Sequence, residues 1–216
     1  MKNIKEDFEK KGYCVLKNCF NQESLNRFYN AVLNINYFHL AKIGENQKKI
    51  QKIYKSKKNI YTKIGEIFEL FEKNDKEALY QLQKFYSVNN DMRMIIETNK
   101  MKNIFKKLLN IGSDVPILVD GPGIFINRPR TKRLLYKWHS ESHYYPKRRN
   151  FLNIWFPIFT NRNEKNGTMF LKEKSHLIQD MPFNEYQGYD KETEGAKNHF
   201  IQYEIPENFV KGLKTY

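Results

Sequence analysis

The chain has 216 residues, of which 40% are hydrophobic and 15% aromatic, so it can bury a sizeable core and is neither a disordered segment nor a repeat array. Its formal net charge of +14 suggests anionic partners, although a lysine-rich composition spread evenly over the surface would give the same charge. With only two cysteines, Cys14 and Cys19, we expect neither a disulfide framework nor a structural zinc site.

The N-terminal region carries no targeting signal and begins with helical patterns. Residues 1–7 lack the apolar run of a signal peptide, and no stretch has the roughly 20 apolar residues of a membrane span, so we expect a soluble, cytoplasmic protein.

A short helix over residues 4–11 should end at Gly12, and residues 13–16 are typical of a strand. Asn21 is placed to cap a second helix, whose buried face would comprise Leu25, Phe28, Tyr29 and Val32.

The next segment is lysine-rich and is followed by three apolar stripes. Residues 41–60 contain seven lysines and one acidic residue, which favours a solvated or mobile insertion over a basic loop that faces an anion. Helical periodicity then returns over residues 64–71, 79–86 and 101–109, and Gly112 should close the last of these helices.

After Gly112 the period of the apolar residues changes from helical to alternating. Short β-rich runs separated by turn signals cover residues 115–119, 123–127, 134–138, 151–159, 168–171 and 200–205. This order predicts a mainly β fold with an α-helical N-terminal layer, namely a double-stranded β-helix of the jelly-roll, cupin-like kind. We expect one domain over residues 1–216, with a largely helical part at 1–112 and the β-helix core at 113–216.

One short motif carries metal-binding chemistry. Trp138-His139-Ser140-Glu141 places an imidazole and a carboxylate two residues apart, and in an extended backbone these side chains point to the same side. An imidazole plus a carboxylate is two thirds of the facial triad of non-heme iron sites. The tripeptide alone is weak, because a surface histidine near an acid gives the same pattern.

The other histidines have less definite roles. His143 lies two residues beyond Glu141, where it would be a competing ligand, a support for a ligand, or a group that faces substrate together with Tyr144. His39 and His176 have no ligand-like spacing, so we expect them to be structural.

Three blocks of the sequence stand in a definite order and spacing. The first runs from Gly12 through Tyr-Cys-Val-Leu to Leu25, and the second is Trp138-His-Ser-Glu-Ser-His-Tyr-Tyr-Pro146. The third joins Phe151-Leu-Asn-Ile-Trp-Phe-Pro-Ile-Phe159 to Asn163-Glu-Lys-Asn-Gly-Thr-Met-Phe-Leu171 and Lys174-Ser-His176. Together the blocks cover most of the chain, and in this order and spacing they resemble the phytanoyl-CoA dioxygenase family of Fe(II)/2-oxoglutarate-dependent oxygenases.

The resemblance implies a double-stranded β-helix, the cofactors Fe(II) and 2-oxoglutarate, and hydroxylation of a small molecule. His139 and Glu141 match the first two iron ligands, although the family more often has aspartate at the second position. Trp155 matches a tryptophan beside the cosubstrate, and Asn127 is a candidate for a polar contact to 2-oxoglutarate. His176 matches a family histidine that does not bind the iron.

The departure from the family pattern is at its end. The resemblance calls for a late histidine as third ligand and an arginine for the distal carboxylate of 2-oxoglutarate, and the only later histidine, His199, lacks the flanking residues. We therefore expect a β-helix that lacks its C-terminal strands, either because the chain is truncated or because a partner supplies them. Exposed sheet edges would then favour a homo-oligomer or another partner that completes the sheet.

Three functional readings follow from these patterns. The first is a dioxygenase acting on a small metabolite, which would be anionic if the basic residues between 128 and 149 line the site instead of forming a solvated rim. The second is a degenerate, non-catalytic jelly-roll binding protein that has lost the third ligand and the arginine. The third, a nucleic-acid binder, rests on charge alone, since no recognised nucleic-acid-binding motif is present.

Overall fold

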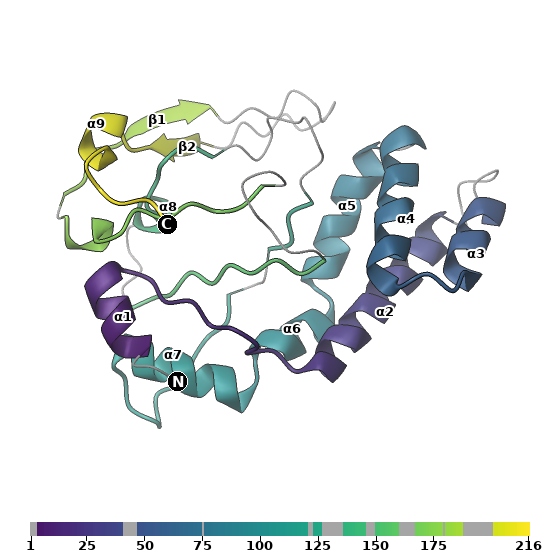
Figure 1. The fold of residues 1–216 in the computed structure, drawn as a ribbon, viewed down its shortest axis with the longest axis horizontal. Helices are drawn as coiled ribbons and strands as arrows, with labels where there is room; N and C mark the ends of the chain where they lie inside the picture. The colour runs from purple at the N-terminus through teal and green to yellow at the C-terminus, as the bar shows by residue number, and fades with distance from the viewer. Residues whose placement is uncertain are drawn as a thin grey trace.

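The computed structural model describes residues 4–40, 47–74, 76–120, 123–126, 136–145, 150–159, 167–178, 180–187 and 201–216. The helices are α1 (Ile4–Lys11), α2 (Gln22–Leu40), α3 (Gln47–Lys55), α4 (Ile60–Asn74), α5 (Lys76–Ser87), α6 (Asn90–Ile96), α7 (Asn99–Leu109), α8 (Glu141–Tyr144), η2 (Ser175–Leu177) and α9 (Glu207–Val210). The strands are β1 (Asn184–Gln187) and β2 (Ile201–Glu204). Figure 1 shows α2 to α5 on one side of the molecule and the C-terminal elements on the other.

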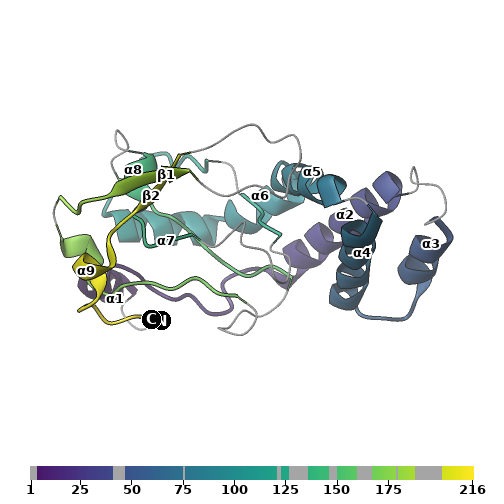
Figure 2. The ribbon, with the colours of Figure 1, turned by 90° about the horizontal axis from the view of Figure 1, so that it is seen from above.

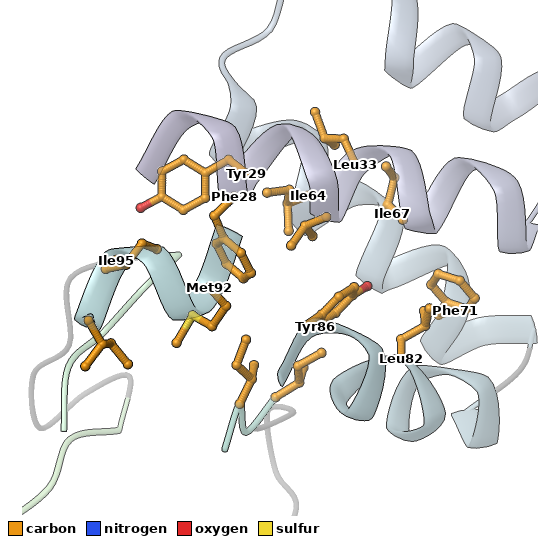
Figure 3. Close-up of a cluster of buried hydrophobic side chains, with 14 of the residues drawn as sticks. Phe28, Tyr29, Leu33, Ile64, Ile67, Phe71, Leu82, Tyr86, Met92 and Ile95 are labelled. Atoms are coloured by element: carbon orange, nitrogen blue, oxygen red, sulfur yellow. The ribbon is translucent and has the colours of Figure 1, made fainter. Parts of the chain in front are cut away.

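Helices α2, α4, α5 and α6 enclose the main hydrophobic core, which is drawn in Figure 3. The predicted face of α2 is confirmed, since Phe28, Tyr29 and Val32 are buried and Leu25 packs against them. Helices α4 and α5 contribute further fully buried side chains, including Ile64, Ile67, Phe71, Leu82 and Tyr86. The Tyr86 hydroxyl donates a hydrogen bond to the Asn36 side chain, so this buried polar group has a partner.

Local sequence signals place several helix ends correctly. The Glu23 N–H donates to Asn21 Oδ1 at 2.7 Å, which confirms Asn21 as the cap of α2. Helix α1 ends before Gly12, as predicted. Helix α7, in contrast, ends at Asn110 in the left-handed conformation and not at Gly112, because asparagine tolerates that conformation as well. The segment 13–16 has no strand partner, so that strand prediction is wrong.

The lysine-rich segment also differs from its prediction. Residues 47–55 form helix α3, which buries Ile50 against the core and packs on α2 and α4. The expectation of a solvated insertion is therefore wrong over this helix, while residues 41–46 lie outside the described ranges. Figure 2 shows α3 at one end of the molecule. The lysines of α3 are exposed, whereas Ile50 faces the core. A short helix of this amphipathic kind needs only a narrow apolar side to pack on its neighbours.

The prediction of a mainly β, double-stranded β-helix is wrong. The described residues are mostly helical, and they form one antiparallel sheet of two strands, in which Asn184 pairs with Glu204 and Gln187 with Ile201. The run at 200–205 does contain β2. The described parts of the other runs after residue 112, however, are irregular or extended without a strand partner, apart from an isolated bridge between Lys172 and Thr215.

The segment 123–126 shows why the alternating pattern misled. Ile124 and Ile126 are buried and Phe125 is exposed, as in a strand with one buried face. Their N–H groups, however, donate to side chains of α5, Ser87 Oγ at 2.9 Å and Gln83 Oε1 at 2.5 Å. Alternation of buried and exposed residues therefore indicates an extended chain with one buried face. In this protein the hydrogen-bond partner of that chain is a helix, where the pattern suggests a neighbouring strand.

The segment that precedes the C-terminal sheet is attached to α1. The Lys174 N–H donates to Lys11 O at 2.8 Å, and His176 Nε2 lies 3.0 Å from Glu9 O. The Tyr13 hydroxyl bonds to Glu173 at 2.9 Å, and the Tyr13 ring packs on the C-terminal Tyr216. Within the described ranges, no helix has the length and apolar character needed to cross a bilayer.

The backbone of Gly12 yields the first testable prediction. Its φ is +86°, and a Cβ built there would collide with the ring of His176. Gly12→Ala should therefore lower the free energy of unfolding by at least about 1–2 kcal/mol, because L-residues are strained at positive φ. Urea denaturation measures the change.

Gly65→Ala is the matched control for this substitution. Gly65 lies inside α4 with nothing within 4 Å of a built Cβ, so alanine should leave stability unchanged or raise it by up to about 1 kcal/mol. Equal effects of the two substitutions would contradict the assigned backbone constraint at Gly12.

Candidate metal centre

The imidazole of His139 and the carboxylate of Glu141 face each other across one residue. Ser140 is extended, with φ −108° and ψ 135°, and this places its two neighbours on the same side, as the sequence predicts. Glu141 then opens the single helical turn of α8, so the backbone does not continue as a strand. His139 Nε2 and Glu141 Oε1 lie 3.5 Å apart, so the longer glutamate side chain does reach the imidazole.

A backbone contact on the Nδ1 side of the His139 ring fixes the orientation of the ring. His139 Nδ1 lies 2.7 Å from the backbone oxygen of Lys137. A carbonyl oxygen can only accept a hydrogen bond, so Nδ1 carries the proton and the neutral ring presents the lone pair of Nε2. That lone pair points to the same space as the Glu141 carboxylate. A histidine whose far nitrogen donates to a carbonyl is the arrangement that metal-binding imidazoles usually have.

The two side chains fit a divalent metal ion as a partial ligand set. Two donors that each lie about 2.0–2.2 Å from one ion are roughly 3 Å apart, close to the separation of Nε2 and Oε1 in this pair. Within the described ranges, no group of three or more His, Cys, Asp or Glu side chains could hold a metal ion. The described residues therefore offer two donors, and His199 lies outside those ranges.

Glu141 also controls the protonation of His139. The hydrogen bond that the protonated His139 ring donates to the Glu141 carboxylate is the largest of the effects that raise the pKa of His139, while burial of the ring opposes it. In the metal-free protein this pair stabilises the fold fully below the unfolded histidine pKa, and its contribution is lost as the pH rises through the raised value. A metal ion would compete with the same proton, so its affinity should fall as the pH is lowered through that pKa.

The second prediction follows from this pair. Glu141→Gln should lower the pKa of His139 in the metal-free protein, because glutamine removes the negative charge and keeps the side-chain shape. An NMR pH titration of the His139 ring protons measures the change. An unchanged His139 pKa would show that the two side chains do not interact in solution.

Aromatic side chains surround the pair. The ring of Tyr144 meets the His139 ring edge to face at 5.6 Å, and the Tyr136 ring lies 5.7 Å from it. The Tyr144 hydroxyl accepts a hydrogen bond from the Tyr203 N–H at 3.3 Å, so strand β2 holds this tyrosine in place. The Tyr144 ring thus lies directly beside the candidate ligand, where it limits access of water to one side of the imidazole.

His143 is packed between aromatic rings. Its ring centroid lies 4.3 Å from that of Phe183 and 5.8 Å from that of Tyr203. Burial, followed by the charge of His139, lowers the pKa of His143, so the ring is neutral at physiological pH. Its Nδ1 is buried and has no hydrogen-bond partner in the described part of the chain. These contacts give His143 a packing role beneath the pair, and contact with a substrate stays a prediction.

The remaining predicted site residues lie elsewhere. Trp155 is 46% exposed on the segment 150–159, in which Phe156 packs on Phe20, just before α2, and Phe159 packs on Phe28 of α2. No hydrogen bond or ring contact among the described residues links Trp155 to His139. Asn127 lies outside the described ranges, as do seven of the eight basic residues between 128 and 149; Lys137 is the one that is described. The contact of His176 with α1 agrees with its expected structural role.

Sequence reasoning missed the residues that hold the motif. Lys137 orients His139 through its backbone oxygen, which no side-chain pattern can reveal. Tyr203 contacts Tyr144, and Glu204 contacts Lys137, from 59 and 67 positions further along the chain. The only available signal was the alternating pattern of residues 200–205, which predicted a strand but not its neighbour.

Comparison with known proteins confirms the family resemblance. A family model described as phytanoyl-CoA dioxygenase (PhyH) matches residues 8–206, which include the His139–Glu141 pair and both strands of the sheet. No curated protein and no solved structure matches the chain.

Proposed function

This chain belongs to the phytanoyl-CoA dioxygenase family, and from that premise we propose that it is an Fe(II)/2-oxoglutarate-dependent dioxygenase that hydroxylates a small, anionic metabolite. The family supports oxygenase chemistry with these two cofactors and a small-molecule substrate. The observation that carries the assignment to a site is the pair of donors, His139 Nε2 and Glu141 Oε1, held 3.5 Å apart. Nitrogen and carboxylate oxygen are the donor types of non-heme iron sites.

In this proposal the protein supplies the ligands and their orientation. His139 would hold iron through Nε2 while its Nδ1 remains bonded to Lys137 O, and Glu141 would bind through a carboxylate oxygen. Bound iron and 2-oxoglutarate would supply the activation of O2. Water, 2-oxoglutarate and a residue outside the described ranges are the candidates for the remaining coordination positions.

The surroundings of the pair would position the other reactants. Tyr144 covers one side of the imidazole and is the described side chain best placed to meet a substrate beside the metal. Trp155 and Asn127 remain our candidates for contact with 2-oxoglutarate, on the strength of the family resemblance. The net charge of +14 and the basic residues on both sides of the motif support an anionic substrate.

A second candidate function has a specific observation in its favour. Only two donors, His139 Nε2 and Glu141 Oε1, come together among the described residues, and no group of three or more His, Cys, Asp or Glu side chains forms there. The alternative is a non-catalytic binding protein of the same family, in which the site binds a ligand without turning it over.

The third prediction separates these two functions. Purified protein supplied with Fe(II), ascorbate and O2 should convert 2-oxoglutarate to succinate, even slowly and without added substrate, and Glu141→Gln should abolish this turnover because it removes an anionic ligand. Succinate formation is measured by mass spectrometry. Binding of Fe(II) and 2-oxoglutarate with no succinate would favour the non-catalytic alternative, and no binding of either would contradict both.

A further inference from the structure

We propose that the sheet β1–β2 is a clamp that fixes the His139–Glu141 pair, and that Lys137 is the positioning residue through which it acts. The inference rests on the proposed function only for the identity of the metal ion. Figures 1 and 2 both show α8 beside the two strands.

Backbone groups at the end of the sheet hold the motif on both sides of the pair. Before the pair, the Ile205 N–H donates to the backbone oxygen of Trp138 at 2.6 Å. After it, the Tyr203 N–H donates to the Tyr144 hydroxyl at 3.3 Å. The three residues 139–141 thus lie between two attachments, one to β2 and one to the residue that follows it, so their position follows that of β2.

Lys137 adds a third attachment through its side chain. Its Nζ lies 2.5 Å from Glu204 Oε2 and 4.9 Å from the centroid of the Tyr186 ring. The register pairs Tyr186 with Gln202, two residues before Glu204, so the carboxylate and the ring lie on the same face of the sheet. Both strands therefore hold this lysine, through an ion pair and a cation–π contact.

The main chain of the same residue orients the imidazole. Lys137 O lies 2.7 Å from His139 Nδ1, so the side chain of Lys137 is anchored to the sheet while its carbonyl selects the Nδ1–H form of His139. Without that carbonyl in place, a neutral histidine exchanges its proton between the two nitrogens and the ring can rotate. The clamp therefore preorganises Nε2 for a metal ion before the ion arrives.

The Lys137–Glu204 pair is too exposed for a role in global stability alone. Both side chains remain partly accessible to solvent, and ion pairs of this kind contribute little to the free energy of unfolding. If Lys137 is a positioning residue, breaking the Lys137–Glu204 pair should change the tautomer of the His139 ring while the protein stays folded.

The test uses charge reversal and NMR of metal-free protein labelled with ¹⁵N-histidine, at a pH well above the histidine pKa. In the unaltered protein the ¹⁵N shifts of His139 should report the Nδ1–H form. Glu204→Lys places two positive charges together and should give a mixture of both forms. The double variant Lys137→Glu/Glu204→Lys restores opposite charges and should restore the single form. Glu204→Gln should act in the same direction with smaller amplitude, which keeps the test valid if lysine prevents folding.

The matched control is Glu97→Lys. Glu97 pairs with Arg93 in α6 at 2.8 Å, and its side chain is 26% exposed against 31% for Glu204. The Glu97→Lys variant should leave the ¹⁵N shifts of His139 unchanged. Unchanged shifts in both Glu204 variants, an equal change in the control, or a double variant that resembles Glu204→Lys would overturn the proposal.

Titration with Co(II), a spectroscopic substitute for Fe(II), distinguishes this inference from the proposed function. Glu204→Lys should bind Co(II) about tenfold more weakly than the unaltered protein, in the range seen for groups that support a metal ligand. If the unaltered protein binds no Co(II) or Fe(II) but its His139 ring responds to Glu204→Lys, the proposed function fails and the clamp stands. If the unaltered protein binds metal, but Glu204→Lys changes neither the ¹⁵N shifts of the His139 ring nor the metal affinity, the clamp proposal fails and the proposed function stands.

Discussion

Replacing His139 with alanine should lower the affinity of the protein for Fe(II) by at least about 100-fold. Substitution of a group that merely supports a metal ligand typically costs 10–100-fold, and His139 is one of only two donors that meet in the described structure. Its Nε2 is the only nitrogen of the pair, and among the described residues no third candidate donor joins the two. Anaerobic titration with Fe(II), followed by measurement of bound metal, gives the affinity directly.

His176→Ala is the control for the loss of a histidine as such. His176 contacts α1 through Glu9 O and lies against Gly12, so it should retain the full Fe(II) affinity once any change in stability is corrected for. Equal metal content in the His139→Ala variant and in the unaltered protein would show that iron, if bound, is held elsewhere in the chain.

Replacing Phe28 with alanine should lower the free energy of unfolding by about 3–5 kcal/mol. Phe28 is fully buried in the core drawn in Figure 3, where its ring meets those of Tyr29 and Phe159. Removing it deletes a large apolar surface and leaves a cavity between α2 and α6 that rigid helices cannot close. Equilibrium unfolding in urea measures the loss.

Phe38→Ala provides a control on the same helix. Phe38 also lies in α2, but 69% of its surface is exposed, so alanine there should change stability by no more than about 0.5 kcal/mol. Similar losses for Phe28 and Phe38 would mean that α2 is not buried along the face that the structure assigns to it.

The two proposals make the helical region and the C-terminal sheet responsible for different properties. The core of α2, α4, α5 and α6 supplies stability, as the Phe28 prediction tests. The small sheet supplies the geometry of the candidate ligands through Lys137 and Tyr144. We therefore expect Glu204 variants to alter metal affinity with little effect on unfolding, and substitutions on the buried face of α2, such as Phe28→Ala, to do the reverse.

The sequence by itself determined the features that depend on neighbouring residues. The apolar stripe of α2 with its Asn21 cap, and the end of α1 at Gly12, follow from spacings of a few residues. The pair His139–Glu141 belongs to the same class, because the extended conformation of one residue, Ser140, is enough to bring the two side chains together. Such features need no knowledge of the rest of the chain.

Tertiary structure alone decided what lies against each segment. Ile124 and Ile126 alternate with Phe125 as strand residues do, yet their backbone groups bond to helix α5, since any donor or acceptor of suitable geometry can satisfy an extended chain. For the same reason the sequence could not show that Glu204 meets Lys137 across sixty-seven positions. Local spacing encodes which face of a segment is buried, whereas its partner depends on contacts between distant parts of the chain.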